Sequence, residues 1–344
     1  MYFLSVRNSK KNAIFCGKNL EKKEEKMWEK CHRQWHKIKF YVKHAHLGLL
    51  PPAWLAKSAA AELERFERAP AELRAAIENR VHYYNALSQP FFLPETAPRV
   101  CHFPRQKPSS YYYDLKALLR YFPLEQRFSA QFGDVTTIPE LPQFVKSRPI
   151  TKNNENAVLL KLDSVRHFYL YPDRLPFRAK KSQLVWRGAA HQNHRIRFLE
   201  HFHQHPLCDV GCIHARSAAK PYHREFMSVK RQLQYRYILS LEGNDVATNL
   251  KWIMASNSLC LMPAPRYETW MMEGRLQAGV HYVQLRDDFA DLEEQILFFE
   301  RYPEAAEAII KNAQQWMSQF ARPETELWTA LLVMKKYFSL LEPQ

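Results

Sequence analysis

The chain has 344 residues, of which 46% are hydrophobic, and it carries a formal net charge of +15. This is enough apolar material for a substantial core, and the length predicts two lobes of ordinary domain size. No apolar run approaches the roughly 20 residues of a membrane-spanning helix, so the sequence disfavours an integral membrane protein. The first residues lack the apolar stretch and cleavage site of a secretory signal, which predicts a cytoplasmic location. The positive charge predicts a negative partner: nucleic acid, an anionic membrane surface or a phosphorylated substrate.

Residues 1–90 form a predicted basic helical N-terminal segment. Its first 43 residues hold twelve Lys or Arg against four Glu. Apolar residues recur there at helical spacing: Trp28, Cys31, Trp35, Ile38 and Val42. A basic amphipathic helix with tryptophans is typical of peripheral attachment to anionic lipid. A helix docked on its own domain, with its basic face in water, fits the pattern equally well. Residues 52–88 predict two further helices, each opened by a proline.

Residues 91–165 predict a smaller first lobe that is rich in prolines and aromatic residues. Loops and short strands are expected there, including "RFSAQFGD", which ends at Asp134. From the residues alone, Asp134 is a turn aspartate that follows Gly133. A polar turn at 153–156 marks the change to a different pattern.

Residues 166–320 alternate between strand-like and helix-like segments. The predicted strands span 182–188, 235–243, 258–263 and 280–285, and the predicted helices span 194–205, 246–256, 291–302 and 303–320. Such alternation predicts an α/β lobe with a largely parallel sheet. Ligands of such sheets bind beyond the carboxyl ends of the strands, so the turns after Trp186 and Leu241 are candidate sites. Residues 321–344 predict a C-terminal helix.

Gly243 stands at one of these strand ends in a chain that has only eight glycines. Glycine suits a positive φ or a close approach of a ligand to the backbone. Neither G-x-G-x-x-G nor a P-loop motif is present, which disfavours a dinucleotide-binding fold and a P-loop ATPase. Free N–H groups at a helix that begins near Val246 would form an anion site. Alternatively, Asp245 is a plain helix cap that accepts from the backbone near Thr248.

Arginines lie close to the other candidate strand end. Arg187 comes just after a strand, and Arg195 and Arg197 lie on the helix that follows. Because arginine is a natural bidentate partner of phosphate oxygens, these residues and the 243–249 turn predict a clamp for a diphosphate.

Two observations bear on metal binding. The chain contains no D-x-D motif, whose carboxylates usually bind the divalent ion beside a diphosphate. Side chains and backbone donors would therefore have to neutralise the leaving group. Cys208, Cys212 and His214 form a C-x3-C-x-H cluster, but no second ligand cluster follows at zinc-finger spacing. A structural pair of thiols is favoured over a metal site, and no metal is expected.

Three segments together resemble glycosyltransferase family 90: "LVWRG…HRIRF", "YRYILSLEGNDVATNLKWIMASNSLCLMP" and "YETWMMEGRLQAGVHYVQLRDDFADLEEQI". That family includes bacterial lipopolysaccharide A proteins, fungal capsule-associated (CAP10-like) xylosyltransferases and animal protein O-glucosyltransferases. The resemblance covers about residues 125–320 and is closest to the bacterial branch. It implies an α/β fold of GT-B type, with two Rossmann-like lobes and the active-site cleft between them. It also implies a UDP-sugar donor, inversion at the anomeric carbon and no bound metal.

The resemblance also assigns roles to residues. Asp134, in the first or acceptor lobe, corresponds to the general base that takes the proton of the acceptor hydroxyl. The first donor-binding segment follows Arg187 and Gly188 and falls on Ala189 and Arg195. The animal members have a serine in place of Ala189, which removes one hydrogen bond to the nucleotide. The second segment follows Gly243 and comprises Asn244, Asp245, Val246, Ala247, Thr248 and Asn249.

Two acids in "YETWMMEGRL", Glu268 and Glu273, are candidates to bind ribose or donor hydroxyls, and a solvated helix face is the alternative. The expected protein is thus an inverting, metal-independent glycosyltransferase that moves a sugar from UDP to a lipopolysaccharide or lipooligosaccharide core. It would lie peripherally on the cytoplasmic face of the inner membrane. The rival acceptors are capsule polysaccharide and a protein hydroxyl. A rival of another class is a non-catalytic nucleic-acid-binding protein, disfavoured because no binding motif is present.

Overall fold

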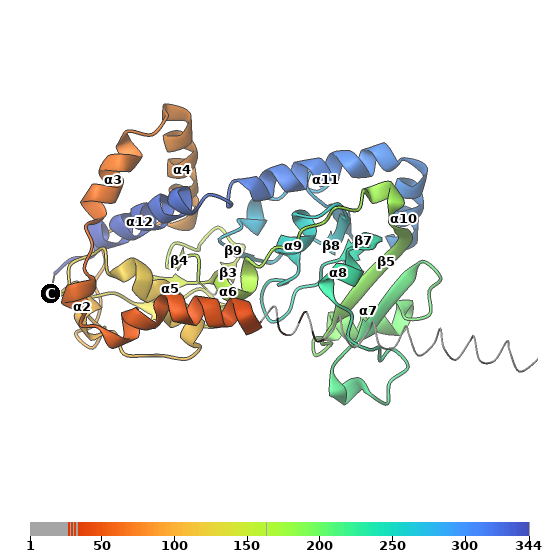
Figure 1. Ribbon diagram of the computed structural model, residues 1–344, viewed down its shortest axis with the longest axis horizontal. Coiled ribbons are helices and arrows are strands. Elements are labelled where there is room, and N and C mark those ends of the chain that lie inside the picture. The colour runs from red at the N-terminus through yellow and green to blue at the C-terminus, as the bar shows by residue number, and fades with distance from the viewer. Residues whose placement is uncertain (1–26, 28, 30, 32–33, 163, 344) are drawn as a thin grey trace, which may run out of the picture.

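The chain forms two bodies side by side along its longest axis (Figure 1). One holds a five-stranded parallel sheet and the other a three-stranded parallel sheet, so the predicted α/β class is confirmed. This computed structural model describes residues 27, 29, 31, 34–162 and 164–343. Trp28, part of the predicted amphipathic helix, lies outside the described residues. No helix within the described residues is long and apolar enough to span a bilayer.

The five-stranded sheet confirms the predicted alternation of strands and helices in the second half of the chain. Its strands are β5 (Lys181–Gly188), β6 (Cys208–Cys212), β7 (Tyr235–Leu239), β8 (Leu259–Pro263) and β10 (Val283–Leu285), in the order β10-β8-β7-β5-β6. Leu184 and Val185 are both fully buried but belong to different apolar clusters. The sheet is therefore covered on both faces, as its continuous apolar strands predict.

Helices cover the two faces of this sheet. The second half of the chain contains α7 (Asn193–Phe202), α8 (Val229–Gln232), α9 (Leu250–Met254), α10 (Leu292–Arg301) and α11 (Pro303–Ser318). Phe198 of α7 and Leu292 of α10 are buried in one cluster, whereas Ile253 of α9 is buried in the other. α11 packs against α9 and β8.

The sheet of the first body is much smaller than that of the second. It consists of β1 (Ala130–Gln131), β2 (Gln143–Val145) and β4 (Ala157–Leu159), in the order β1-β2-β4. α5 (Ser109–Leu119), with its three buried tyrosines, packs beside it. Three short strands take the place of the repeated strand–helix units expected of a first Rossmann-like lobe.

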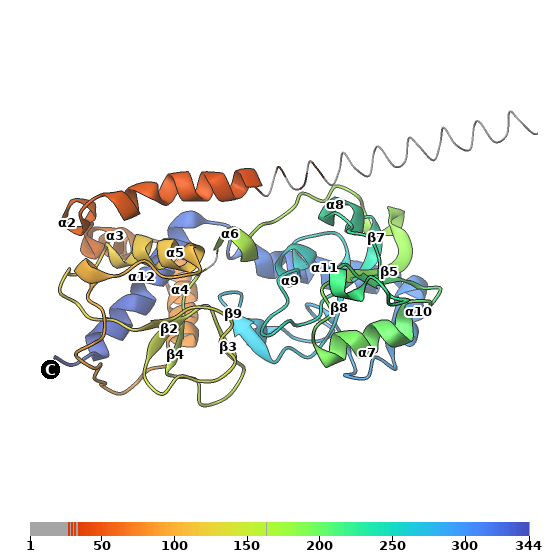
Figure 2. The same ribbon diagram turned by 90° about the horizontal axis from the view of Figure 1, so that it is seen from below.

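Helices from both ends of the chain complete the first body. The predicted C-terminal helix is α12 (Pro323–Leu340), which packs on α3 (Ala59–Glu67) and α4 (Ala71–Tyr84). The helix predicted to start at Pro52 is broken into α2 (Pro52–Leu55) and α3, because Ser58 caps α3 by accepting from the Ala61 N–H. Residues 34–49 form a further helix on the outside of this body (Figure 2). The remaining elements are α6 (Ser164–His167), η1 (Val100–His102), η2 (Phe177–Ala179), η3 (Ala215–Ser217) and η4 (Glu273–Arg275).

A two-stranded antiparallel ladder joins the two bodies. β3 (Ser147–Pro149) comes from the first half of the chain and β9 (Tyr267–Thr269) from the second, and Arg148 lies opposite Glu268. The Arg148 Nε lies 2.7 Å from the Glu268 carboxylate, and both side chains are 1% exposed. The Tyr83 hydroxyl also donates to Glu268. The prediction that Glu268 contacts donor hydroxyls is therefore wrong, because its carboxylate is fully occupied and closed to solvent.

Candidate active site

The turn after β7 is longer than the sequence predicted. A helix was expected from Val246, but α9 begins only at Leu250, and it is five residues long. The Asn249 side chain folds the turn back onto the strand, since its amide donates to the Leu239 carbonyl over 3.0 Å and its oxygen lies 3.2 Å from the Ser240 hydroxyl. Both the helix N-terminal anion site and the Asp245 cap are thus corrected: residues 245–249 are an irregular turn.

Arg195 holds this turn against the end of β5. Its guanidinium donates to three backbone carbonyls at 2.7–2.8 Å: those of Ala189, Leu241 and Glu242. It also lies over the Trp186 ring, 5.6 Å from the centroid. Burial lowers the pKa of Arg195 to about 10. Arg195 therefore joins the two predicted donor-binding segments, although the bonds that it makes in this structure go to backbone oxygens.

The two glycines at these strand ends, Gly188 and Gly243, differ in the room that each leaves for a side chain. A Cβ on Gly188 would lie 2.6 Å from the Trp186 ring, so packing alone demands glycine there. A Cβ on Gly243 would meet no atom closer than the Arg195 Nη2 at 3.6 Å. These are ordinary contact distances, so packing does not demand glycine there, and the half-buried Gly243 leaves its backbone accessible to a close ligand.

Arg187 lies apart from Arg195. Successive residues of a strand point to opposite faces, and Trp186 is the residue whose ring contacts Arg195. The Arg187 guanidinium instead forms an ion pair with Asp209, which also accepts from the Tyr235 hydroxyl. The two arginines therefore do not form the single clamp that the sequence predicted.

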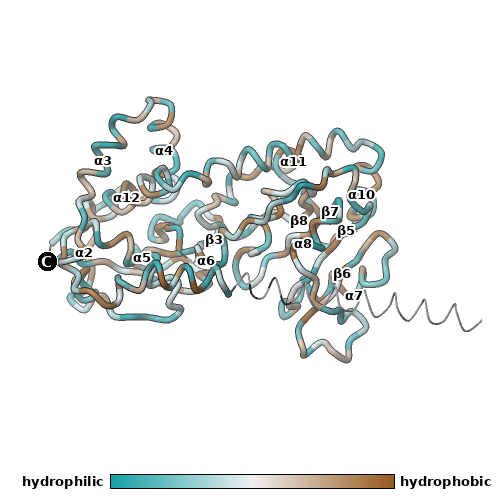
Figure 3. The backbone as a smooth tube through the Cα atoms, in the orientation of Figure 1, coloured by the Kyte–Doolittle hydropathy of each residue, from teal (hydrophilic) through white to brown (hydrophobic). Residues whose placement is uncertain are grey.

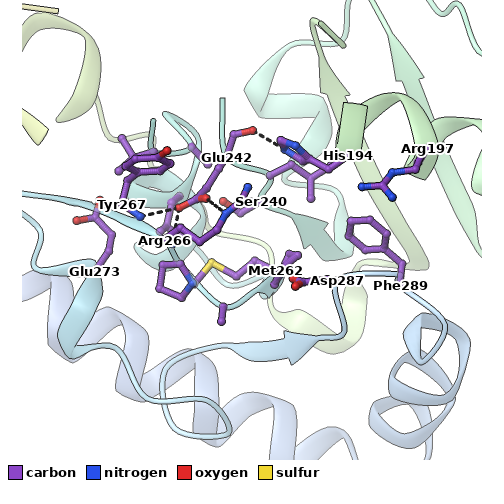
Figure 4. A pocket seen from close by; sticks show the side chains of 17 residues that line it. His194, Arg197, Ser240, Glu242, Met262, Arg266, Tyr267, Glu273, Asp287 and Phe289 are labelled. Atoms are coloured by element: carbon purple, nitrogen blue, oxygen red, sulfur yellow. Dashed lines mark hydrogen bonds and ion pairs between the residues drawn. The ribbon is translucent and has the colours of Figure 1, made fainter. Parts of the chain in front are cut away.

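A pocket of about 130 Å³ lies beyond the carboxyl ends of β7 and β8 (Figure 4). Its wall includes both polar and apolar side chains, among them His194, Arg197, Glu242, Val246, Ala247 and Met262. Glu242 closes one side, where its carboxylate accepts from the Arg266 and Tyr267 N–H groups over 2.8 and 3.1 Å. Burial raises the pKa of Glu242. This is the position at which a parallel α/β sheet presents its ligand site.

Asp134 reaches the same turn from the other body. The Asn244 amide donates to one Asp134 oxygen over 3.2 Å. Lys146 lies 2.8 Å from the other oxygen and 2.6 Å from the Asp245 carboxylate. The Lys146 side chain is 3% exposed, whereas that of Asp134 is 39% exposed and accessible to a substrate. The structure thus brings together Asp134 and the 244–249 turn, which lie more than a hundred residues apart in the sequence.

The surroundings keep Asp134 ionised. Burial opposes the charge on Asp134, but the hydrogen bonds from Lys146 and Asn244 and the positive charges of Lys146 and Arg166 outweigh it, so the pKa of Asp134 is lowered. Lys146 stays protonated in turn, since the Asp245 charge raises its pKa despite its burial.

A second hollow, of about 450 Å³, lies at the Thr248 end of the turn. It is lined by Thr248 of the turn, by Val165, Arg166 and Tyr169, and by Gln34, His36 and Lys37 of the 34–49 helix. Thr248 is exposed, whereas Val246 and Ala247 are buried and face the first pocket. The turn therefore separates two hollows, with Asp134 at its Asn244 end.

Sequence reasoning missed Lys146, which pairs with both Asp134 and Asp245. Lys146 follows the buried Phe144 and Val145 of β2, and a lysine next to such an apolar strand was a signal that it had a partner. Lys251 is fully buried, and its Nζ lies 2.7 Å from the Glu273 carboxylate. Glu273 also accepts from the Thr269 N–H and hydroxyl, so it is not on a solvated helix face.

The cysteine cluster shows no metal-binding arrangement. Cys208 and Cys212 begin and end β6 as buried free thiols. Among the residues that the structure describes, no group of three or more His, Cys, Asp or Glu is placed to hold a metal ion.

Comparison with known proteins decides the family. The model of glycosyl transferase family 90 matches residues 164–343, just over half of the chain. The chain belongs to glycosyltransferase family 90. Membership of family 90 supports transferase activity. The match covers the five-stranded sheet, the 243–249 turn and α12, whereas Asp134 and the 34–49 helix lie outside it.

The family 90 chain also resembles an uncharacterised protein, 035R, of Invertebrate iridescent virus 3. The two are 26% identical over 166 residues, which are 48% of this chain and 13% of the viral protein. The chain therefore spans only a small part of the length of that relative.

Proposed function

We propose that this family 90 member transfers a sugar from a UDP-sugar to a hydroxyl of a lipopolysaccharide or lipooligosaccharide core, with inversion and without a metal. The reaction would take place between two lobes arranged in the GT-B manner, on the cytoplasmic face of the inner membrane. One observation carries the proposal: the Asp134 carboxylate, from the first body, lies 3.2 Å from the Asn244 amide of the turn in the second body. An acceptor-activating base and a donor-binding turn need this proximity.

In this proposal Asp134 acts as the general base. As the acceptor oxygen attacks the anomeric carbon, its proton passes to the Asp134 carboxylate. The bond between the anomeric carbon and the diphosphate breaks at the same time, and UDP leaves with the electron pair. The lowered pKa of Asp134 keeps this carboxylate ionised at neutral pH. Its partial exposure leaves room for the acceptor hydroxyl.

The donor would bind at the turn and in the pocket beyond β7 and β8. The apolar part of the wall, with Val246, Ala247 and Met262, suits the nucleoside. Arg197 in the same wall and the accessible backbone at Gly243 suit the diphosphate. Arg195 supports this site by fixing the turn, and Arg187 has no direct part in it.

A screen of donors tests the proposal. The purified chain is incubated with several UDP-sugars, with and without truncated core oligosaccharides, and released UDP is measured. We expect acceptor-dependent release from one UDP-sugar, and we expect it to persist in excess EDTA. The absence of release with every donor, or complete loss in EDTA, would contradict the proposal.

Two matched variants test the base. Asp134→Asn should lower kcat by about 10²–10⁴-fold, the contribution of a general base, while UDP-sugar affinity stays close to that of the wild type. Asp288→Asn changes an exposed aspartate that pairs with Arg286 and accepts from the Ala290 N–H, and it should be as active as the wild type. Turnover by Asp134→Asn at the rate of this control would remove Asp134 from the mechanism.

A further inference from the structure

The helix of residues 34–49 has two different faces, and one of them docks on the first body. Leu47 is buried in the core, and the Tyr41 hydroxyl lies 2.9 Å from the Ser109 hydroxyl at the start of α5. The rings of Tyr41 and Tyr113 meet edge to face, with centroids 5.9 Å apart. Gly48 allows the close approach, since a Cβ there would lie 3.2 Å from the Tyr113 hydroxyl. The helix is therefore held in place by its inner face.

The outer face of the same helix is apolar and exposed. Trp35, Ile38, Val42 and Leu49 are 63%, 53%, 70% and 82% exposed. At 3.6 residues per turn, these positions fall within an arc of about 60°. Trp54 of α2, just after the helix, is 78% exposed. Figure 2 shows the helix along one edge of the molecule, with no other described element on its outer side. Figure 3, coloured by hydropathy, shows apolar and polar residues interspersed along the backbone of the same helix. Together these five residues form what we call the outer stripe.

The charged side chains of the segment that carries the outer stripe are all cationic. No Asp or Glu occurs between Lys30 and Ala61 in the sequence. Lys39 and Lys43 are exposed and flank the stripe along the helix. The charge pattern therefore complements an anionic surface along the whole length of the stripe.

The lysines beside the outer stripe favour a lipid bilayer over a protein partner, and tryptophan suits a bilayer surface. Protein interfaces enrich arginine and deplete lysine at their centre. At a bilayer surface, tryptophan lies at the level of the headgroups, and lysine extends its ammonium to lipid phosphates while its stem covers apolar surface. A helix with one apolar face and flanking lysines lies in the plane of such an interface.

We propose that the outer stripe is a membrane-docking surface that lies in the headgroup region of an anionic bilayer. The opposite side of the helix lines the hollow that contains Thr248 and Arg166, so docking places the bilayer on the side of the molecule where this hollow lies. If the proposed transfer takes place there, a point that rests on the proposed function, the acceptor is anchored in the membrane that the helix touches.

Flotation of the full chain with lipid vesicles tests the surface. Vesicles of phosphatidylcholine alone and of phosphatidylcholine with phosphatidylglycerol are compared at moderate salt. The wild type should float with the anionic vesicles at least tenfold more than with the neutral ones. The combined variant Trp35→Ser, Ile38→Ser, Val42→Ser should lose at least tenfold of this binding. Lys39→Gln with Lys43→Gln should remove most of the preference for phosphatidylglycerol.

A matched control removes exposed apolar side chains elsewhere. Leu297 and Phe298 of α10 are 53% and 48% exposed, and their change to serine should leave flotation unchanged. Thermal melting of each variant verifies folding. The proposal is overturned if the wild type ignores anionic vesicles or if the triple variant floats as well as the wild type. It is also overturned if the triple variant instead converts a dimer to a monomer, which would make the stripe an interface between copies.

Flotation needs neither donor nor acceptor, so its outcome is independent of the transferase assay. Transfer to a vesicle-embedded acceptor should fall tenfold in the triple variant, while transfer to a water-soluble acceptor stays the same. The absence of transfer in both assays would count against the proposed function and would leave the flotation result to decide the surface.

Discussion

Breaking the buried pair between Arg148 and Glu268 should remove a large share of the stability of the chain. Arg148→Met removes the ion pair of 2.7 Å and also the hydrogen bonds to the Tyr83 and Ala157 carbonyls, of 2.7 and 2.9 Å. In this variant Glu268, which is 1% exposed, keeps the hydrogen bond from the Tyr83 hydroxyl but loses the positive charge of Arg148.

The expected loss follows from this burial. Breaking a buried pair by removal of one partner costs about 3–5 kcal/mol, because the other charge is left unpaired in a medium of low polarity. Arg65 is a suitable control, since its side chain is 58% exposed and its pairs with Glu62 and Glu324 lie at the surface. Arg65→Met should cost about 0–1 kcal/mol.

Urea unfolding, followed by tryptophan fluorescence, measures both losses. The double variant Arg148→Met, Glu268→Met tests the reason, since replacing both partners by apolar groups removes the unpaired charge. We expect it to be more stable than Arg148→Met alone. The reasoning is refuted if Arg148→Met and Arg65→Met have equal free energies of unfolding, or if the double variant is no more stable than the single one.

Three further predictions concern the site. Lys146→Met removes the charge that lowers the pKa of Asp134, so this pKa should rise. Because activity needs the ionised base, the acid limb of the pH–rate profile should move to higher pH. An unchanged acid limb would contradict this. Gly188→Ala places a Cβ 2.6 Å from the Trp186 ring and should destabilise the chain by about 1–3 kcal/mol; an unchanged melting temperature would show that the ring moves freely. Arg195→Lys carries its three donors on one nitrogen, which cannot span the three carbonyls that Nε, Nη1 and Nη2 of Arg195 reach separately. UDP affinity measured by calorimetry should therefore fall at least tenfold, and wild-type affinity would show that the turn does not need this support.

The second body was predicted well because its signals are local. Apolar runs of strand length alternate with amphipathic stretches, and β5, β7 and β8 lie where those runs predicted them. The start of α9 was predicted too early, because Val246 to Asn249 has no helix-breaking residue. The hydrogen bonds of the Asn249 side chain to Leu239 and Ser240 hold these residues in a turn. Such contacts with the preceding strand leave no periodic pattern in the sequence.

The site itself was predicted in part. Asp134 was selected by resemblance, whereas the turn was already a candidate from its place at a strand end. Their contact depends on how two distant segments pack, which no local pattern reports. Arg187 was placed in the clamp because it is near Arg195 in sequence, although the alternation of strand side chains already assigns Trp186 and Arg187 to opposite faces. The burial of Glu268 was not predicted, because its ion pair with Arg148 joins residues 120 positions apart in the sequence.

The ladder between β3 and β9 limits how the two bodies can move. A separation of the halves would have to break backbone hydrogen bonds and expose Arg148, whereas a twist about the ladder would keep both intact. The Asp134–Asn244 contact lies close to the ladder, because Lys146, which precedes Ser147 of β3, pairs with both Asp134 and Asp245. A twist about the ladder would therefore move these residues little, and substrates would enter a site whose two sides stay joined at Lys146.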